Sequence, residues 1–154
     1  MAPEEDGPLA FLKVMWAIDH SLARQSKRMA RAIGITAPQR FVLRMLGRHE
    51  PLSAGHLARL MHMHPSTLTG ILTRLEARRL IKRVADPADA RRAVLTLTPK
   101  GRSFDRDMPG TVEAAAARAT SAARPSDYRG ARRFLARFQD ELDRLDEADD
   151  PPAP

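Results

Sequence analysis

The sequence predicts a mainly α-helical protein that carries one small β-hairpin. Apolar residues recur at helical spacing in several segments, for example at Leu68, Ile71, Leu72 and Leu75. A single run, residues 94–97, instead shows the β-branched alternation that is typical of a strand. Capping residues and prolines fall at the boundaries between these segments, which indicates where the elements begin and end.

The N-terminal part of the chain predicts a lead-in and two helices. Residues 1–8 hold two prolines and three acids and are expected to be disordered. A helical pattern over residues 9–32 ends near Gly34, which suits a helix C-terminus. Thr36 and Gln39 form a capping box that opens the second helix. In that helix we expect these side chains to face the core: Phe41, Val42, Met45 and Leu46.

Residues 52–101 read as helix, turn, helix and hairpin. Ser53 is a good N-cap for a short helix, and Pro65 suits the first position of a second helix that extends to Arg79. The face of this second helix opposite its apolar stripe carries short side chains and one arginine: Ser66, Thr67, Thr69, Gly70, Thr73 and Arg74. Such a face, together with Pro65, can approach phosphates and base edges closely, as the major groove of DNA requires.

The hairpin is expected to have strands over residues 80–85 and 92–98, joined by a turn-forming loop. Arg91 and Arg92 lie at the far end of that loop. An arginine on a projecting hairpin is placed to enter a narrow minor groove, where the potential is most negative. Because DNA repels acids, we interpret Asp89 as the partner that holds a loop arginine in position.

Charge is concentrated in the same part of the chain. The chain has a net charge of +7, and residues 59–102 alone hold ten basic and three acidic residues, also a net charge of +7. This concentration is the electrostatic footprint of phosphate binding. Lys82, Arg83 and Lys100 are therefore candidate phosphate contacts.

Two helical segments are predicted after the hairpin. Thr98 and Pro99 open a helix that we expect to run past Arg118, with a kink or break at residues 109–110. The last helix starts at Pro125, and its apolar stripe needs a partner, either the first helix or a second copy of the chain. The stripe comprises Phe134, Leu135, Phe138, Leu142 and Leu145. Residues 148–154 are expected to be a disordered tail.

Residues 52–101 resemble the MarR family of bacterial winged helix-turn-helix transcriptional regulators. The resemblance is carried by Leu57-Ala58, Ser66-Thr67-Leu68-Thr69, Arg74-Leu75-Glu76, Leu80-Ile81, Arg83 and above all residues 86–101, DPADARRAVLTLTPKG. The sequence departs from the family at Arg79, where a glycine commonly ends the DNA-recognition helix, here the helix that starts at Pro65.

The resemblance implies a homodimer that binds double-stranded DNA at a palindromic operator near its own gene and acts as a repressor. Residues 36–104 would form the winged helix-turn-helix domain. Residues 9–35 and 105–147 would form the helical dimerisation region. The alternative from another class is a winged-helix module that binds a protein partner and makes no DNA contact.

A small-molecule effector site is predicted on the first helix. Trp16, His20 and Arg24 form a row at i, i+4 and i+8. Trp16 can be read as core or dimer-interface packing, or as the wall of a pocket for a flat anionic aromatic molecule. In the second reading Arg40 and Arg44 face the same cleft.

Other function classes are poorly supported. The chain has no cysteine, which excludes disulfides, thiolate metal sites and catalytic thiols, together with the thiol-based peroxide sensing of one branch of the family. Its five histidines lack metal-ligand spacing, and it has no glycine-rich phosphate loop or nucleophile elbow. We therefore expect no enzyme, cofactor or metal. Without an export signal or an apolar run of ~20 residues, a cytoplasmic protein is predicted.

Overall fold

A computed structural model of the protein describes residues 7–149 with the exception of residues 87 and 90. Most of the predicted lead-in and tail, residues 1–6 and 150–154, lies outside the described residues. The chain divides into two compact units, Met1–Val112 and Glu113–Pro154.

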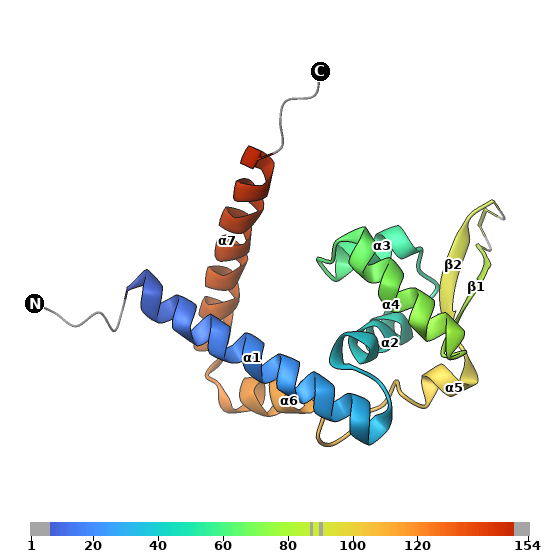
Figure 1. The fold of residues 1–154 in the computed structure, drawn as a ribbon, viewed down its shortest axis with the longest axis horizontal. Helices are drawn as coiled ribbons and strands as arrows, with labels where there is room; N and C mark the ends of the chain where they lie inside the picture. The colour runs from blue at the N-terminus through green and yellow to red at the C-terminus, as the bar shows by residue number, and fades with distance from the viewer. Residues whose placement is uncertain (1–6, 87, 90, 150–154) are drawn as a thin grey trace, which may run out of the picture. The chain divides into compact units, whose positions relative to one another are not determined.

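The elements confirm a mainly helical protein with one small antiparallel hairpin (Figure 1). In chain order they are α1 (Pro8–Ile33), α2 (Ala37–His49), α3 (Ala54–Leu60), α4 (Pro65–Ala77), β1 (Ile81–Ala85), β2 (Ala93–Leu97), α5 (Pro99–Arg102), α6 (Val112–Ala122) and α7 (Pro125–Asp149). None of the described helices has the length and apolar character that a bilayer crossing needs.

The helix N-termini form at the predicted capping residues. The Thr36 hydroxyl accepts a hydrogen bond from the Gln39 N–H at 3.4 Å, and the Gln39 side chain accepts one from the Thr36 N–H at 3.0 Å. Ser53 caps α3 through the His56 N–H at 3.2 Å, and Thr98 caps α5 in the same way. Each cap satisfies a backbone donor that has no partner within its helix.

The core of the first unit lies between α2, α3, α4 and the hairpin. The predicted stripe of α4 is buried, with Leu68, Leu72 and Leu75 at most 1% exposed and Ile71 9% exposed. This stripe packs in one cluster with residues of the other elements, including Leu46, Leu57, Leu80 and Leu95.

The expected inward face of α2 is wrong at one position. Phe41 is 43% exposed, whereas Leu43 is fully buried. Residues two apart on a helix point about 200° apart, so these two side chains cannot share a face. Leu43 lies one turn before Leu46, and the buried face therefore includes Leu43 and excludes Phe41.

The hairpin is attached to the segment between α2 and α3. β1 and β2 pair from Ile81 opposite Leu97 to Ala85 opposite Ala93. On the other side of β2, Leu52 exchanges backbone hydrogen bonds with Leu95. The Leu97 N–H donates to a Glu50 carboxylate oxygen at 2.7 Å, and the other oxygen of Glu50 pairs with Arg102. β2 is therefore held along both of its edges.

The predicted helix after the hairpin is wrong in its extent. α5 ends at Arg102, and the chain becomes helical again only at Val112. The break includes the expected residues 109–110, where Gly110 has a φ of 74°, but it begins earlier. Carbonyls in this break accept hydrogen bonds from Arg40 of α2, and these long-range contacts replace those of a continuous helix.

α4 ends through a left-handed residue at the position where the family commonly has glycine. Arg79 has a φ of 57°, its N–H donates to the Glu76 carbonyl at 2.8 Å, and the Leu80 N–H donates to the Leu75 carbonyl at 2.9 Å. These two bonds form a Schellman motif, in which a residue with a Cβ is disfavoured.

Arg79→Gly is expected to raise the free energy of unfolding by about 1 kcal/mol, because glycine adopts this φ without a Cβ clash. Urea denaturation of the purified variant measures the change. The matched control is Ala77→Gly, two residues earlier in helical conformation, which should lower the stability by about 1 kcal/mol. Equal destabilisation by both substitutions would contradict this account of the helix end.

Candidate nucleic-acid interface

The N-terminus of α4 is shaped by a histidine. His64 is the N-cap, and its Nδ1 accepts a hydrogen bond from the Ser66 N–H at 3.3 Å and lies 2.7 Å from the Ser66 hydroxyl oxygen. Pro65 occupies the first helical turn, where its missing N–H is not needed. The imidazole therefore takes the place of the shorter side chains that usually cap helices.

The face of α4 opposite the buried stripe is exposed along its length. It comprises the predicted residues Ser66, Thr67, Thr69, Gly70, Thr73 and Arg74. The Thr69 hydroxyl donates to the Pro65 carbonyl at 2.8 Å, and the Thr73 hydroxyl donates to the Thr69 carbonyl at 2.9 Å. Both hydroxyl hydrogens point back to the helix, so the oxygens are left to accept hydrogen bonds from outside.

Hydrogen bonds to neighbouring elements hold the C-terminal end of α4. The Thr98 hydroxyl lies 2.7 Å from the Arg79 carbonyl, and the Arg78 guanidinium donates to the Gly34 carbonyl in the turn after α1. Lys100, a predicted phosphate contact, donates to the Arg78 carbonyl at 3.3 Å. The orientation of α4 is thus tied to α1 and α5 by hydrogen bonds.

Two aspartates accept backbone hydrogen bonds within the described part of the hairpin loop. The Asp86 carboxylate accepts from the Ala88 N–H at 2.9 Å, and the Asp89 carboxylate accepts from the Arg91 N–H at 3.0 Å. Asp89 also lies 3.4 Å from the Arg92 guanidinium, so it contacts a loop arginine. The Arg91 side chain is exposed beside this pair.

The basic residues of β1 differ in their contacts. Arg83 forms an ion pair with Glu76 of α4 at 2.8 Å, and a second nitrogen of its guanidinium lies 3.4 Å from the same carboxylate. Lys82 is exposed. Since surface ion pairs contribute only about 0–1 kcal/mol, Arg83 can leave Glu76 for a phosphate at little cost.

A polar cleft of about 630 Å³ lies between α3 and the hairpin, and its existence was not predicted. Its lining includes Ser53, His56, Arg59, Asp86, Arg92 and Val94. His56 and Arg59 come from α3 and add basic groups beside the loop arginine. Arg59 contributed only to the charge count in the sequence, because nothing in a one-dimensional pattern places α3 against the hairpin.

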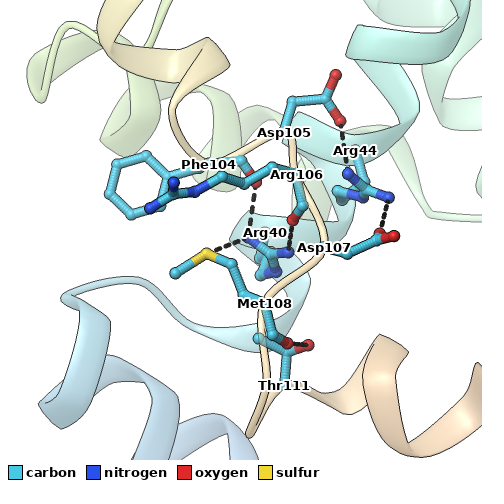
Figure 2. Close-up of polar contacts among 8 residues, drawn as sticks. All are labelled: Arg40, Arg44, Phe104, Asp105, Arg106, Asp107, Met108 and Thr111. Carbon is cyan, nitrogen blue, oxygen red and sulfur yellow. Dashed lines mark hydrogen bonds and ion pairs between the residues drawn. The ribbon is translucent and has the colours of Figure 1, made fainter.

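The residues of the predicted effector site are not all brought together. Trp16, His20 and Arg24 are exposed on α1, with Trp16 70% exposed. Arg40 is 1% exposed and the Arg44 side chain is mostly buried, and both bind residues 104–107 (Figure 2). The expectation that Arg40 faces an open cleft is therefore corrected, because backbone carbonyls enclose its guanidinium. Within residues 7–149, gaps excepted, no cluster of three potential metal ligands is found.

The comparisons with known proteins agree with this arrangement. Residues 35–93 match the model of the MarR family. The chain is 30% identical over 110 residues to the organic hydroperoxide resistance transcriptional regulator of Bacillus subtilis, covering 70% of this chain and 74% of that protein. It is 28% identical over 138 residues to an HTH-type transcriptional repressor of Mycobacterium tuberculosis, covering 90% and 98%.

A solved structure is similar in fold. The protein is BpsR of Bordetella bronchiseptica, whose DNA binding is regulated by 6-hydroxynicotinic acid. The TM-score is 0.68 at 24% sequence identity, and the similarity covers 91% of this chain and 98% of that chain.

Gly70→Ala separates helix stability from the function of the exposed face. A Cβ at Gly70 meets no atom within 4 Å, so alanine should stabilise α4 by about 1 kcal/mol. If α4 lies against DNA, the added methyl group should weaken binding about tenfold, equivalent to ~1.4 kcal/mol. The probe is a duplex that the wild-type protein enriches from a random-sequence library, called here the selected duplex.

The control for this substitution is Gly130→Ala in α7, where a Cβ also meets nothing within 4 Å. That variant should gain stability and keep its affinity for the selected duplex. Equal affinities of both variants and the wild type would show that α4 does not approach DNA at Gly70.

Proposed function

The chain belongs to the MarR family, and from this premise we propose that it is a homodimeric repressor of a palindromic operator near its own gene. DNA-binding transcriptional regulation is the function of the family that residues 35–93 match. The observation that carries the proposal is the exposed face of α4, with short side chains outward and the leucine stripe buried.

α4 reads base edges in the major groove. Because the Thr69 and Thr73 hydroxyl hydrogens are engaged by helix carbonyls, their oxygens are poised to accept from the amino groups of cytosine or adenine. The methyl groups of both threonines suit contact with thymine. Ser66 and Thr67 contact bases or phosphates near the N-terminus, and Arg74 reaches the groove one turn further along.

The hairpin reads the adjacent minor groove through Arg91. Asp89 supports this role from inside the loop, because it binds the Arg91 N–H and the Arg92 guanidinium. Arg92, Lys82 and Arg83 hold phosphates on either side. These contacts fix the position of the protein on the duplex, whereas the contacts of α4 specify the sequence.

Dimerisation involves the helices at the two ends of the chain. α1 exposes Leu9, Val14, Ile18 and Leu22, and α7 exposes Phe134, Leu135, Leu142 and Leu145. Large apolar side chains in such number favour burial against a second copy. Two-fold symmetry then places the two α4 helices about one DNA turn apart, ~34 Å, which matches a palindrome.

A small aromatic or anionic effector regulates DNA binding. The exposed row of Trp16, His20 and Arg24 offers an aromatic surface with cationic neighbours. DNA binding of the fold relative BpsR is regulated by 6-hydroxynicotinic acid, an aromatic acid of the kind this row would suit. Arg40 and Arg44 are left out of the proposed site because residues 104–107 occupy them.

Binding to the promoter beside the gene should weaken steeply with salt, by about 0.9 log units per phosphate contact per log unit of salt. Arg91→Ala should weaken binding at least about tenfold in a gel shift, because each half-site loses a minor-groove contact. Size-exclusion chromatography should show the variant to be as dimeric as the wild type.

The control for Arg91→Ala is Arg118→Ala in α6, which removes the same charge from an exposed position outside residues 36–104. Its affinity should match that of the wild type. Normal affinity of Arg91→Ala would show the role of the hairpin to be wrong. A wild-type protein that binds no duplex above random competitor would favour the protein-interaction alternative.

Tryptophan emission tests the effector site, because Trp16 is the only tryptophan in the chain. Titration with a panel of aromatic acids, urate among them, should change the emission and release the selected duplex over the same concentration range. Arg24→Gln should shift both titrations to higher concentrations, since it removes a cationic neighbour of the ligand. A panel that leaves emission and DNA binding unchanged would end the proposal.

A further inference from the structure

The segment that joins α5 to α6 is fastened to one face of α2 (Figure 2). Arg40 lies at the centre of this contact with a side chain that is almost fully buried. One nitrogen of its guanidinium donates to the Phe104 carbonyl at 2.6 Å and lies 3.1 Å from the Met108 sulfur, and the other donates to the Arg106 carbonyl at 2.6 Å. The planar fork of the guanidinium thus spans alternate carbonyls of a non-helical segment.

Arg44 fastens the same segment one turn further along α2. Its two nitrogens lie 3.2 Å from an Asp105 carboxylate oxygen and 2.8 Å from an Asp107 oxygen. The Arg44 and Asp105 side chains are only 15% and 20% exposed, so solvent screens this pair less than a surface pair. Residues four apart on a helix share a face, which aligns Arg44 with Arg40.

Gly47 completes this face of α2 at the next turn. A Cβ built there would lie 1.8 Å from an Asp105 carboxylate oxygen, which means that Asp105 packs directly on the helix backbone. Arg40, Arg44 and Gly47 follow i, i+4 and i+7 spacing, so one stripe of α2 faces residues 104–108. We call this set of contacts the α2 clamp.

Polar contacts continue along this segment to the end of the first unit. The Thr111 side chain is 5% exposed, and its hydroxyl donates to the Met108 carbonyl at 2.8 Å. The second unit begins two residues later, at Glu113. Polar contacts therefore fix the position at which the chain leaves the first unit. A flexible linker of similar length would leave that position undefined.

We propose that the α2 clamp sets the spacing of the two winged helix-turn-helix domains in the dimer, residues 36–104 of each chain, called here the heads. Arg40 and Arg44 are then positioning residues for DNA binding. This inference rests on the proposed function, since it needs a dimer whose C-terminal helices take part in the interface. A palindrome gains affinity over a half-site only if both α4 helices reach their grooves together. Loosening the clamp lowers the effective concentration of the second head at its half-site, whereas the structure of each head is unchanged.

The test uses variants with opposite changes in net charge. Arg44→Gln lowers the charge by one per chain, whereas the double variant Asp105→Asn and Asp107→Asn raises it by two. A purely electrostatic effect would shift DNA affinity in opposite directions. Loss of the clamp predicts the same direction for both. Arg40→Lys is the third variant, because a single ammonium cannot reproduce the two-pronged contact of the guanidinium.

The measurement compares the selected duplex with a version in which one half-site is scrambled. For the wild type, avidity should favour the intact duplex by about 10²-fold or more. In all three variants the ratio of the two affinities should fall about tenfold. Affinity for the scrambled duplex, measured at the same ionic strength and corrected for the change in net charge, should stay within about twofold of the wild-type value. The variants should also tolerate insertion of one base pair between the half-sites better than the wild type.

The outcomes distinguish this inference from the proposed function. If the wild-type protein selects no two-fold symmetric sequence, the proposed function fails. If it does, and the folded, dimeric clamp variants keep the full ratio, the inference is overturned. An equal loss of affinity for the intact and scrambled duplexes would also overturn it, because it would place the defect within each head. Thermal unfolding and size exclusion establish folding and dimer content, and the milder Asp107→Asn variant replaces any variant that fails to fold.

Discussion

Burial of one stripe of α4 is the constraint on which the rest of the structure depends. Leu68, Leu72 and Leu75 are almost completely removed from solvent, and each contributes roughly 1.5–3 kcal/mol by burial. Rotating the helix by one residue, about 100°, would expose these leucines and bury threonine hydroxyls. The leucines thereby fix which side chains face outward. The chemistry of the exposed face is set by packing on the opposite side of the same helix.

The features predicted correctly are those encoded within a few residues. Caps such as Thr36 and Ser53, the stripe of α4 and the position of β2 all depend on neighbours close in the chain. α2 was harder to orient because Phe41, Val42 and Leu43 are consecutive and apolar, and only the tertiary context decides which of them point inward. The early end of α5 and the burial of Arg40 depend on contacts between residues 64 to 68 positions apart, which no local pattern contains.

Basic residues serve two different purposes in this chain, and their count cannot separate them. Arg40, Arg44 and Arg78 bind carbonyls or carboxylates and hold segments together, whereas Arg74 and Arg91 extend from exposed positions. A formal charge contributes to the electrostatic field in either case. Only geometry shows which guanidinium groups are engaged by the protein and which face outward. This explains why Arg40 suggested a ligand contact in the sequence and is a structural residue in the fold.

The edges of the small sheet are another place where polar side chains limit what the molecule can do. Backbone groups at the rim of a sheet invite strand addition from other chains, which leads to aggregation. Here Leu52 and the Glu50 carboxylate cover one rim by pairing with Leu95 and Leu97. The other rim belongs to β1, where Lys82 and Arg83 would repel the same strand of a neighbouring copy. Polymerisation through the hairpin is thereby discouraged, and self-association is left to the helices.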